Sequence, residues 1–119
     1  MAEHNELGKL GEELAVDYLL KNGYTILETN WTFQKAEVDI IAQFEETLAI
    51  IEVKTRSSIE FGLPQDFVNS KKIKLLTKAI DNYVVDKNLD INVRFDIIAI
   101  HLENKSFVIE HITDAFYHF

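Results

Sequence analysis

The chain has 119 residues, of which 47% are hydrophobic and 27% charged, and its formal net charge is −8. This length and composition predict one globular domain spanning residues 1–119, and exclude a disordered chain or a pair of domains. The sequence has no cysteine, which excludes disulfides and thiolate metal sites. It also has no run of about 18 apolar residues that would span a membrane.

The expected cellular location of the protein and the distribution of its charge limit the kinds of molecule that it can bind. The first residues lack the basic-then-apolar order of a signal peptide, so we expect a cytoplasmic protein with no membrane partner. A charge of −8 argues against nucleic acid as a partner. However, residues 54–78 carry six basic and two acidic side chains, within an otherwise acidic chain. This segment either contacts an anionic partner or is a solvated helix face.

In chain order, apolar periodicity predicts seven elements. They are a helix over residues 6–21, strands over 24–31, 36–44 and 47–54, a helix over 65–86, and strands over 94–102 and 106–112. Gly23 is expected to cap the first helix, and residues 61–65 are expected to form a loop. The order α-β-β-β-α-β-β predicts an α/β fold with a mixed central sheet flanked by helices.

Charged residues stand inside two of the apolar strands. Asp39 lies in the strand over residues 36–44, and Glu52 and Lys54 lie in the next strand. Residues two apart on a strand point the same way, so Glu52 and Lys54 share a face, and strand pairing brings Asp39 beside them. An edge ion pair between Glu52 and Lys54 is the simpler alternative. The apolar neighbours instead indicate partial burial, where ionised groups are costly.

The first helix offers a third carboxylate. Glu12 lies at the margin of the apolar face, between Ala15, Val16 and Leu19 and next to Gly8, and these small neighbours are expected to let the helix approach the sheet closely. Glu12 is thus the acid of this helix best placed to reach inward, although an acid here also stabilises the helix dipole. Converging carboxylates repel one another unless a cation joins them, and oxygen ligands favour Mg²⁺ or Mn²⁺. Such an ion with a nearby lysine is suited to phosphodiester hydrolysis.

These residues resemble known motifs. Asp39 followed by Glu52-Val53-Lys54 resembles the PD-(D/E)XK signature of restriction-endonuclease-like nucleases, although no proline is present. Nearly the whole chain is similar to the YraN-type family, which is uncharacterised in function and similar to archaeal Holliday-junction resolvases; Ala36 replaces that family's usual glycine. The matching motifs are Gly11-Glu12 with Ala15, Gly23-Tyr24, Asn30, Ala36-Glu37-Val38-Asp39, residues 52–56, Phe61-Gly62, Lys72 and Arg94-Phe95-Asp96.

The resemblance implies a restriction-endonuclease-like core and a set of site residues. The catalytic residues would be Glu12, Asp39, Glu52 and Lys54, and the three acids would be ligands of Mg²⁺ or Mn²⁺. Glu37 would support this site.

Basic residues beyond Lys54 are candidates for nucleic-acid binding. Lys72 falls within the apolar face of the second helix, where it either snorkels to solvent or reaches toward a negative site. Lys71 and Lys74 belong to an outward stripe on the same helix. Together with Arg56, these three lysines are expected to contact a phosphate backbone.

We therefore expect a Mg²⁺-dependent endonuclease that hydrolyses DNA rather than RNA, branched or structured DNA included. A homodimer would supply two active sites for symmetrical cutting. The alternative is a non-catalytic nucleic-acid-binding or partner-binding adaptor that keeps the nuclease fold, and the apolar tail at residues 116–119 suits docking on a second copy.

Two further expectations concern residues outside this set. Asp96 stands in a buried strand and needs a partner such as Arg94 or a backbone donor, which suggests a structural role. None of the four histidines has metal-ligand spacing, and we assign them no catalytic part.

Overall fold

The computed structural model describes residues 2–56 and 70–115. These residues form α1 (Ala2–Lys21), β1 (Thr25–Phe33), β2 (Ala36–Phe44), β3 (Thr47–Arg56), α2 (Ser70–Asp86), β4 (Asn92–Glu103) and β5 (Ser106–Ile112). No helix in this part of the chain is both long enough and apolar enough to cross a membrane.

The expected α/β fold, with a mixed central sheet flanked by helices, is confirmed. Gly23 ends the first helix as expected, with φ of 88°, while the Tyr24 amide donates to the Leu19 carbonyl at 2.9 Å. β1 continues to Phe33, beyond the expected end at residue 31. The turn after β1 places Gln34 in the left-handed region, with φ of 54°. Glutamine is not one of the residues that typically indicate such a turn, so the sequence did not predict it.

Some expectations lie outside the described residues. They are the loop at residues 61–65 with its Phe61-Gly62 motif, the start of the second helix at 65–69, and the apolar tail at 116–119.

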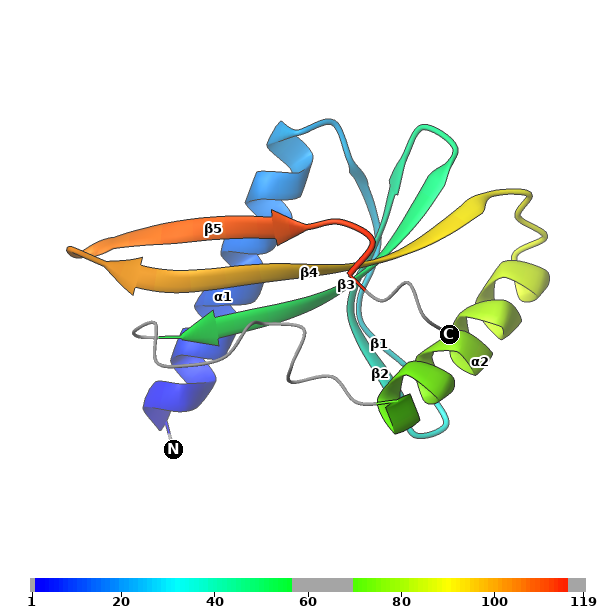
Figure 1. The fold of residues 1–119 in the computed structure, drawn as a ribbon, viewed down its shortest axis with the longest axis horizontal. Helices are drawn as coiled ribbons and strands as arrows, with labels where there is room; N and C mark the ends of the chain where they lie inside the picture. Colours follow the sequence, from blue (N-terminus) through cyan, green and yellow to red (C-terminus); the bar gives the residue numbers. More distant parts are fainter. Residues whose placement is uncertain (1, 57–69, 116–119) are drawn as a thin grey trace.

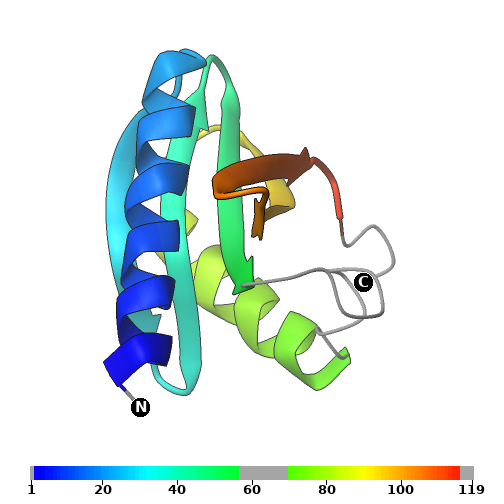
Figure 2. The same cartoon turned by 90° about the vertical axis from the view of Figure 1, so that its left-hand side faces the viewer.

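The described strands form one sheet in the order of the chain, β1-β2-β3-β4-β5. Neighbouring strands are antiparallel except β3 and β4, which are parallel. Two parallel neighbours need a crossover between them, and α2 lies in that connection. Figures 1 and 2 show α1 and α2 against opposite faces of the sheet. β3 and β4 are therefore interior strands with a helix layer on each side.

Two apolar clusters fill the two interfaces between helix and sheet. The cluster under α1 is built from small and branched side chains: Ala15, Leu19, Ile40, Ala42, Ala49, Ile51, Ile98 and Ile100. The cluster under α2 has larger members: Val38, Ile41, Leu48, Ile50, Leu76, Ile80, Tyr83, Phe95 and Ile97. Alternating side chains of β3 and β4 supply both clusters, which is why these strands read as nearly continuous apolar runs.

The close approach of α1 to β3 depends on Gly11. A Cβ atom added at Gly11 would lie 1.9 Å from Oγ1 of Thr55 and 2.9 Å from its Cβ, so the whole Thr55 side chain would have to move. Of the small residues expected to allow this approach, Ala15 is fully buried against the sheet, whereas a Cβ at Gly8 would meet nothing within 4 Å. The expectation is therefore confirmed for Ala15 and wrong for Gly8, and the closest contact is at Gly11.

Replacing Gly11 should therefore destabilise the fold, whereas replacing Gly8 should not. We expect Gly11→Ala to lower the free energy of unfolding by about 1–3 kcal/mol through overpacking against Thr55. Gly8→Ala should be neutral, or stabilising by up to about 1 kcal/mol, because alanine favours the helix. Urea denaturation of the two variants measures both values. Equal stabilities would contradict the close contact.

Candidate functional site

The main-chain pairing of β2 and β3 stops before either strand ends. Their register runs from Phe44–Thr47 to Ile40–Ile51 and goes no further. Beyond that point, Oδ2 of Asp39 accepts a hydrogen bond from the Val53 amide at 2.8 Å. A side-chain carboxylate thus takes the position of a main-chain acceptor, and it holds the two strands together where their ladder ends.

The alternation of side chains along β2 also changes at Asp39. Val38 and Ile41 are three residues apart, yet both pack in the cluster under α2, whereas Ile40 packs under α1. Residues three apart on a regular strand would face opposite sides. β2 is therefore irregular around Asp39, where its carboxylate bonds to β3.

A pocket of about 370 Å³ opens at this parting of β2 and β3. Acidic and basic side chains line it in equal number: Glu37, Asp39 and Glu52 with Lys35, Lys54 and Lys72. Leu75 and Leu76 of α2 form part of its apolar wall. We call this cavity the acid–lysine pocket. The predicted adjacency of Asp39, Glu52 and Lys54 is confirmed by their shared lining of this pocket.

Glu52 is the centre of the ion pairs in the pocket. Its Oε2 atom pairs with Nζ of Lys72 and lies 3.6 Å from Nζ of Lys54. The Glu52 side chain is only 11% exposed, against 28% for Lys54 and 35% for Lys72. Lys72, in the first turn of α2, thus points toward the negative site, as one of its two sequence readings expected.

Asp39 is the most perturbed acid of the pocket. Burial and, as a smaller effect, the neighbouring Glu52 carboxylate together raise its pKa to about 7, although the hydrogen bond from Val53 lowers it. The charge of Glu12 on α1 adds a smaller effect in the same direction. At neutral pH the pair of carboxylates therefore favours holding a proton or binding a cation.

Glu12 itself lies outside the acid–lysine pocket. It is half-buried and lines a separate cavity of about 330 Å³ with Lys9, Glu13, Val16, Thr29, Asn30 and Ile40. Within residues 2–56 and 70–115, no group of three or more His, Cys, Asp or Glu side chains is arranged to hold a metal ion. The carboxylates that meet are the pair Asp39 and Glu52.

Of the remaining predicted residues, Glu37 alone is among those that line the pocket. Glu37 is exposed on β2 and lines it, and Arg56 is half-buried at the end of β3. Lys71 and Lys74 are exposed on α2. Lys35 was not predicted, and its only signal was a cation in the turn directly before the acidic strand.

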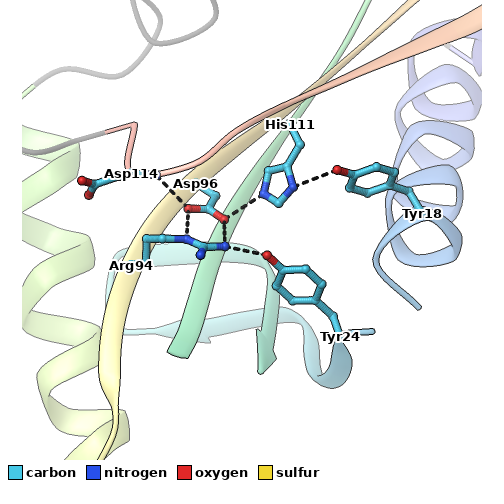
Figure 3. Close-up of polar contacts among 6 residues, drawn as sticks. All are labelled: Tyr18, Tyr24, Arg94, Asp96, His111 and Asp114. Atoms are coloured by element: carbon cyan, nitrogen blue, oxygen red, sulfur yellow. Dashed lines mark hydrogen bonds and ion pairs between the residues drawn. The ribbon is translucent and has the colours of Figure 1, made fainter. Parts of the chain in front are cut away.

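A second polar cluster lies apart from this pocket, around the buried Asp96 (Figure 3). Among the described residues Asp96 is the one charged side chain that is fully buried. Arg94 donates to both of its oxygens, at 2.9 and 2.8 Å, and the Asp114 amide donates at 3.0 Å. The expectation of Arg94 or a backbone donor is confirmed in both forms. Nε2 of His111 lies 2.8 Å from Oδ2.

This Asp96 cluster ties the start of the chain to its end. Arg94 also donates to the Tyr24 hydroxyl at 2.6 Å, and the Tyr18 hydroxyl lies 3.1 Å from Nδ1 of His111 (Figure 3). Burial alone would raise the pKa of Asp96, but the bonds from His111, Arg94 and Asp114 outweigh it and hold the pKa below its ordinary value. The cluster therefore stabilises an ionised Asp96 inside the fold.

The fold and the pocket define an α/β protein with a mixed sheet and an acid–lysine pocket where two strands part. The chain belongs to UPF0102, described as an uncharacterised protein family, whose pattern matches residues 11–100. The expected membership of the YraN-type family is confirmed by this match.

Relatives share this sequence along nearly its whole length. A UPF0102 protein of Flavobacterium psychrophilum is 66% identical over 119 residues, covering all of both chains. One from Flavobacterium johnsoniae is 63% identical over 123 residues, again covering both chains. A UPF0102 protein of Phocaeicola vulgatus is 49% identical over 117 residues, covering 98% of this chain and 97% of its own.

The raised pKa of Asp39 predicts a pH-dependent loss of stability. Because the folded state favours the protonated acid, stability should fall as the pH rises from the ordinary value of 3.8 to about 7, and then level off. Asp39→Asn keeps an acceptor for the Val53 amide and removes this dependence. Urea unfolding between pH 4 and 8 measures the difference between the two proteins. Glu37→Gln, at an exposed acid of the same strand, is the control, and identical curves for wild type and Asp39→Asn would refute the prediction.

Removing the Asp96 carboxylate should be strongly destabilising. Asp96→Ala leaves Arg94 and His111 without their buried partner, so the free energy of unfolding should fall by roughly 3–5 kcal/mol. Asp114→Asn should have little effect, because Asp114 contributes its backbone amide and asparagine tolerates its φ of 55°. Guanidinium denaturation of both variants provides the comparison, and a loss below about 1 kcal/mol for Asp96→Ala would contradict the role of the cluster.

Proposed function

We propose that this protein is a divalent-metal-dependent nuclease that hydrolyses phosphodiester bonds of DNA. The observation that carries the proposal is the meeting of Asp39, Glu52 and Lys54 in one pocket, with Glu52 and Lys54 3.6 Å apart. The resemblance to restriction-endonuclease-like nucleases supports the same conclusion, because these three residues match its acid, acid and lysine positions.

The carboxylates fit Mg²⁺ or Mn²⁺. Magnesium is commonly held by one or two carboxylates, with water and substrate phosphates completing its coordination. Asp39 and Glu52 offer such a pair, and burial together with the Glu52 carboxylate raises the pKa of Asp39 to about 7, so a cation beside Asp39 would stabilise its charged form. Glu12 remains a predicted third ligand: it lines a separate cavity, but its charge acts on Asp39.

Each side chain of the pocket then has a part in hydrolysis. When bound, the divalent ion supplies the polarisation of a phosphoryl oxygen and makes water more acidic. Asp39 and Glu52 would hold that ion, and the bond from Val53 fixes the orientation of Asp39. Lys54 would place a positive charge where negative charge develops on the phosphate. Glu37 also lines the pocket and would support the charge balance of this set.

The surrounding basic residues suit a nucleic-acid backbone. Lys71 and Lys74 are exposed on α2, whose Leu75 and Leu76 line the pocket, and Arg56 follows Lys54 on β3. These positive charges, on the two elements that supply Lys54 and Lys72 to the pocket, would attract phosphates despite the overall charge of −8. The substrate we favour is DNA, branched or structured DNA included, and a homodimer would bring two such pockets to two strands.

A non-catalytic adaptor is the second candidate function. Its supporting observation is that Lys54 and Lys72 already neutralise Glu52, so the pocket is stable as a set of internal ion pairs. Such a protein would bind nucleic acid or a partner with the nuclease fold but without chemistry. Salt-dependent DNA binding without cleavage would favour this candidate.

Cleavage assays with matched variants test the nuclease. Wild type should cut labelled linear, flapped or four-way-junction DNA in Mg²⁺ or Mn²⁺, and chelation should stop the reaction. Asp39→Asn, Glu52→Gln and Lys54→Met should each reduce the rate by at least about a hundredfold. Asp81→Asn, at an exposed acid of α2, should leave the rate unchanged. The proposal would be refuted if all four variants still cut DNA at the wild-type rate. It would also be refuted if the wild-type protein cut none of the substrates.

A further inference from the structure

The pairing of Lys72 with Glu52 is not explained by nucleic-acid binding, the role that the sequence suggested for Lys72. Its ammonium pairs with Oε2 of Glu52, inside the acid–lysine pocket. Lys54 approaches the same oxygen atom at 3.6 Å. Two cations therefore share one oxygen of a carboxylate whose side chain is only 11% exposed.

We infer that Lys72 is the resident counter-ion of Glu52, and that a divalent cation must displace its ammonium to bind there. This inference rests on the proposed function, because it takes Asp39 and Glu52 as the metal ligands. A hard divalent cation and an ammonium group compete for the same carboxylate oxygen, and they repel each other at short range. Lys72 is thus a positioning residue that lowers the affinity of the pocket for divalent ions.

The placement of the two lysines indicates which of them leaves. Lys54 lies two residues from Glu52 on the same strand, so the sheet itself fixes its Cα atom beside the carboxylate. Lys72 lies in the first turn of α2. Its long, flexible side chain is 35% exposed. It can turn toward solvent without moving a strand. Lys54 would therefore stay beside Glu52 and remain available for hydrolysis, while the ammonium of Lys72 would leave Glu52 when the divalent ion binds.

Calorimetric titration of the full chain with Mn²⁺, in the absence of DNA, tests this exchange. Lys72→Met should bind Mn²⁺ about tenfold more tightly than wild type, because the competing charge is gone. Lys72→Arg keeps the charge and should bind as weakly as wild type. Lys78→Met removes one charge from an exposed position of the same helix and should change the affinity by less than about twofold. If circular dichroism shows Lys72→Met to be unfolded, Lys72→Gln carries the same expectation.

The outcomes separate this inference from the function on which it rests. Equal Mn²⁺ affinities for wild type and Lys72→Met, with binding lost in Glu52→Gln, would overturn the role of Lys72 and leave the metal site standing. Tighter binding by both Lys72→Met and Lys78→Met would also overturn it, since net charge alone would then explain the gain. Absence of Mn²⁺ binding in wild type and Lys72→Met alike would remove both proposals.

Discussion

The hydrogen bond from the Val53 amide to Asp39 is the interaction on which the candidate site depends. It lies where the ladder between β2 and β3 ends, and it turns an acid of one strand toward the other. Without it, Asp39 and Glu52 would belong to two diverging strands with no reason to meet. Because the bond uses one carboxylate oxygen, it also orients Asp39 within a pocket lined by five other charged side chains.

The charge balance of that pocket explains how a fold tolerates half-buried acids. Three acidic and three basic side chains line it, and Glu52 is paired twice. Such charge compensation stabilises the pocket without a bound ion. This is compatible with a catalytic site before metal and substrate bind, and equally with a binding site that has no catalytic activity. The two functions differ in whether a divalent ion replaces part of this internal pairing, and that difference turns on Lys72.

Short-range patterns account for what the sequence could predict. Apolar periodicity gave the elements, and the hairpin between β2 and β3 placed Asp39 beside Glu52 and Lys54. Contacts between distant segments were not predictable, because nothing local marks them. The pairing of Lys72 with Glu52 was one of two open alternatives. The contact of Gly11 with Thr55 was not predicted, and of the small residues expected to let α1 approach the sheet, Gly8 takes no part. The spacing of the histidines excludes a metal site but says nothing of single hydrogen bonds, so the contacts of His111 with Asp96 and Tyr18 were not predicted.

The Asp96 cluster has a consequence for how the protein is made. Its members come from residues 18 to 114, so the cluster cannot form until the chain as far as Asp114 has left the ribosome. Until then Arg94, two residues away on the same strand, is the partner available to Asp96, and His111 and Asp114 have not yet emerged. If β4 were buried at this stage, Asp96 would be buried without its full set of hydrogen-bond donors. β4 is thus expected to stay unburied during synthesis, and folding should complete in one late, cooperative step.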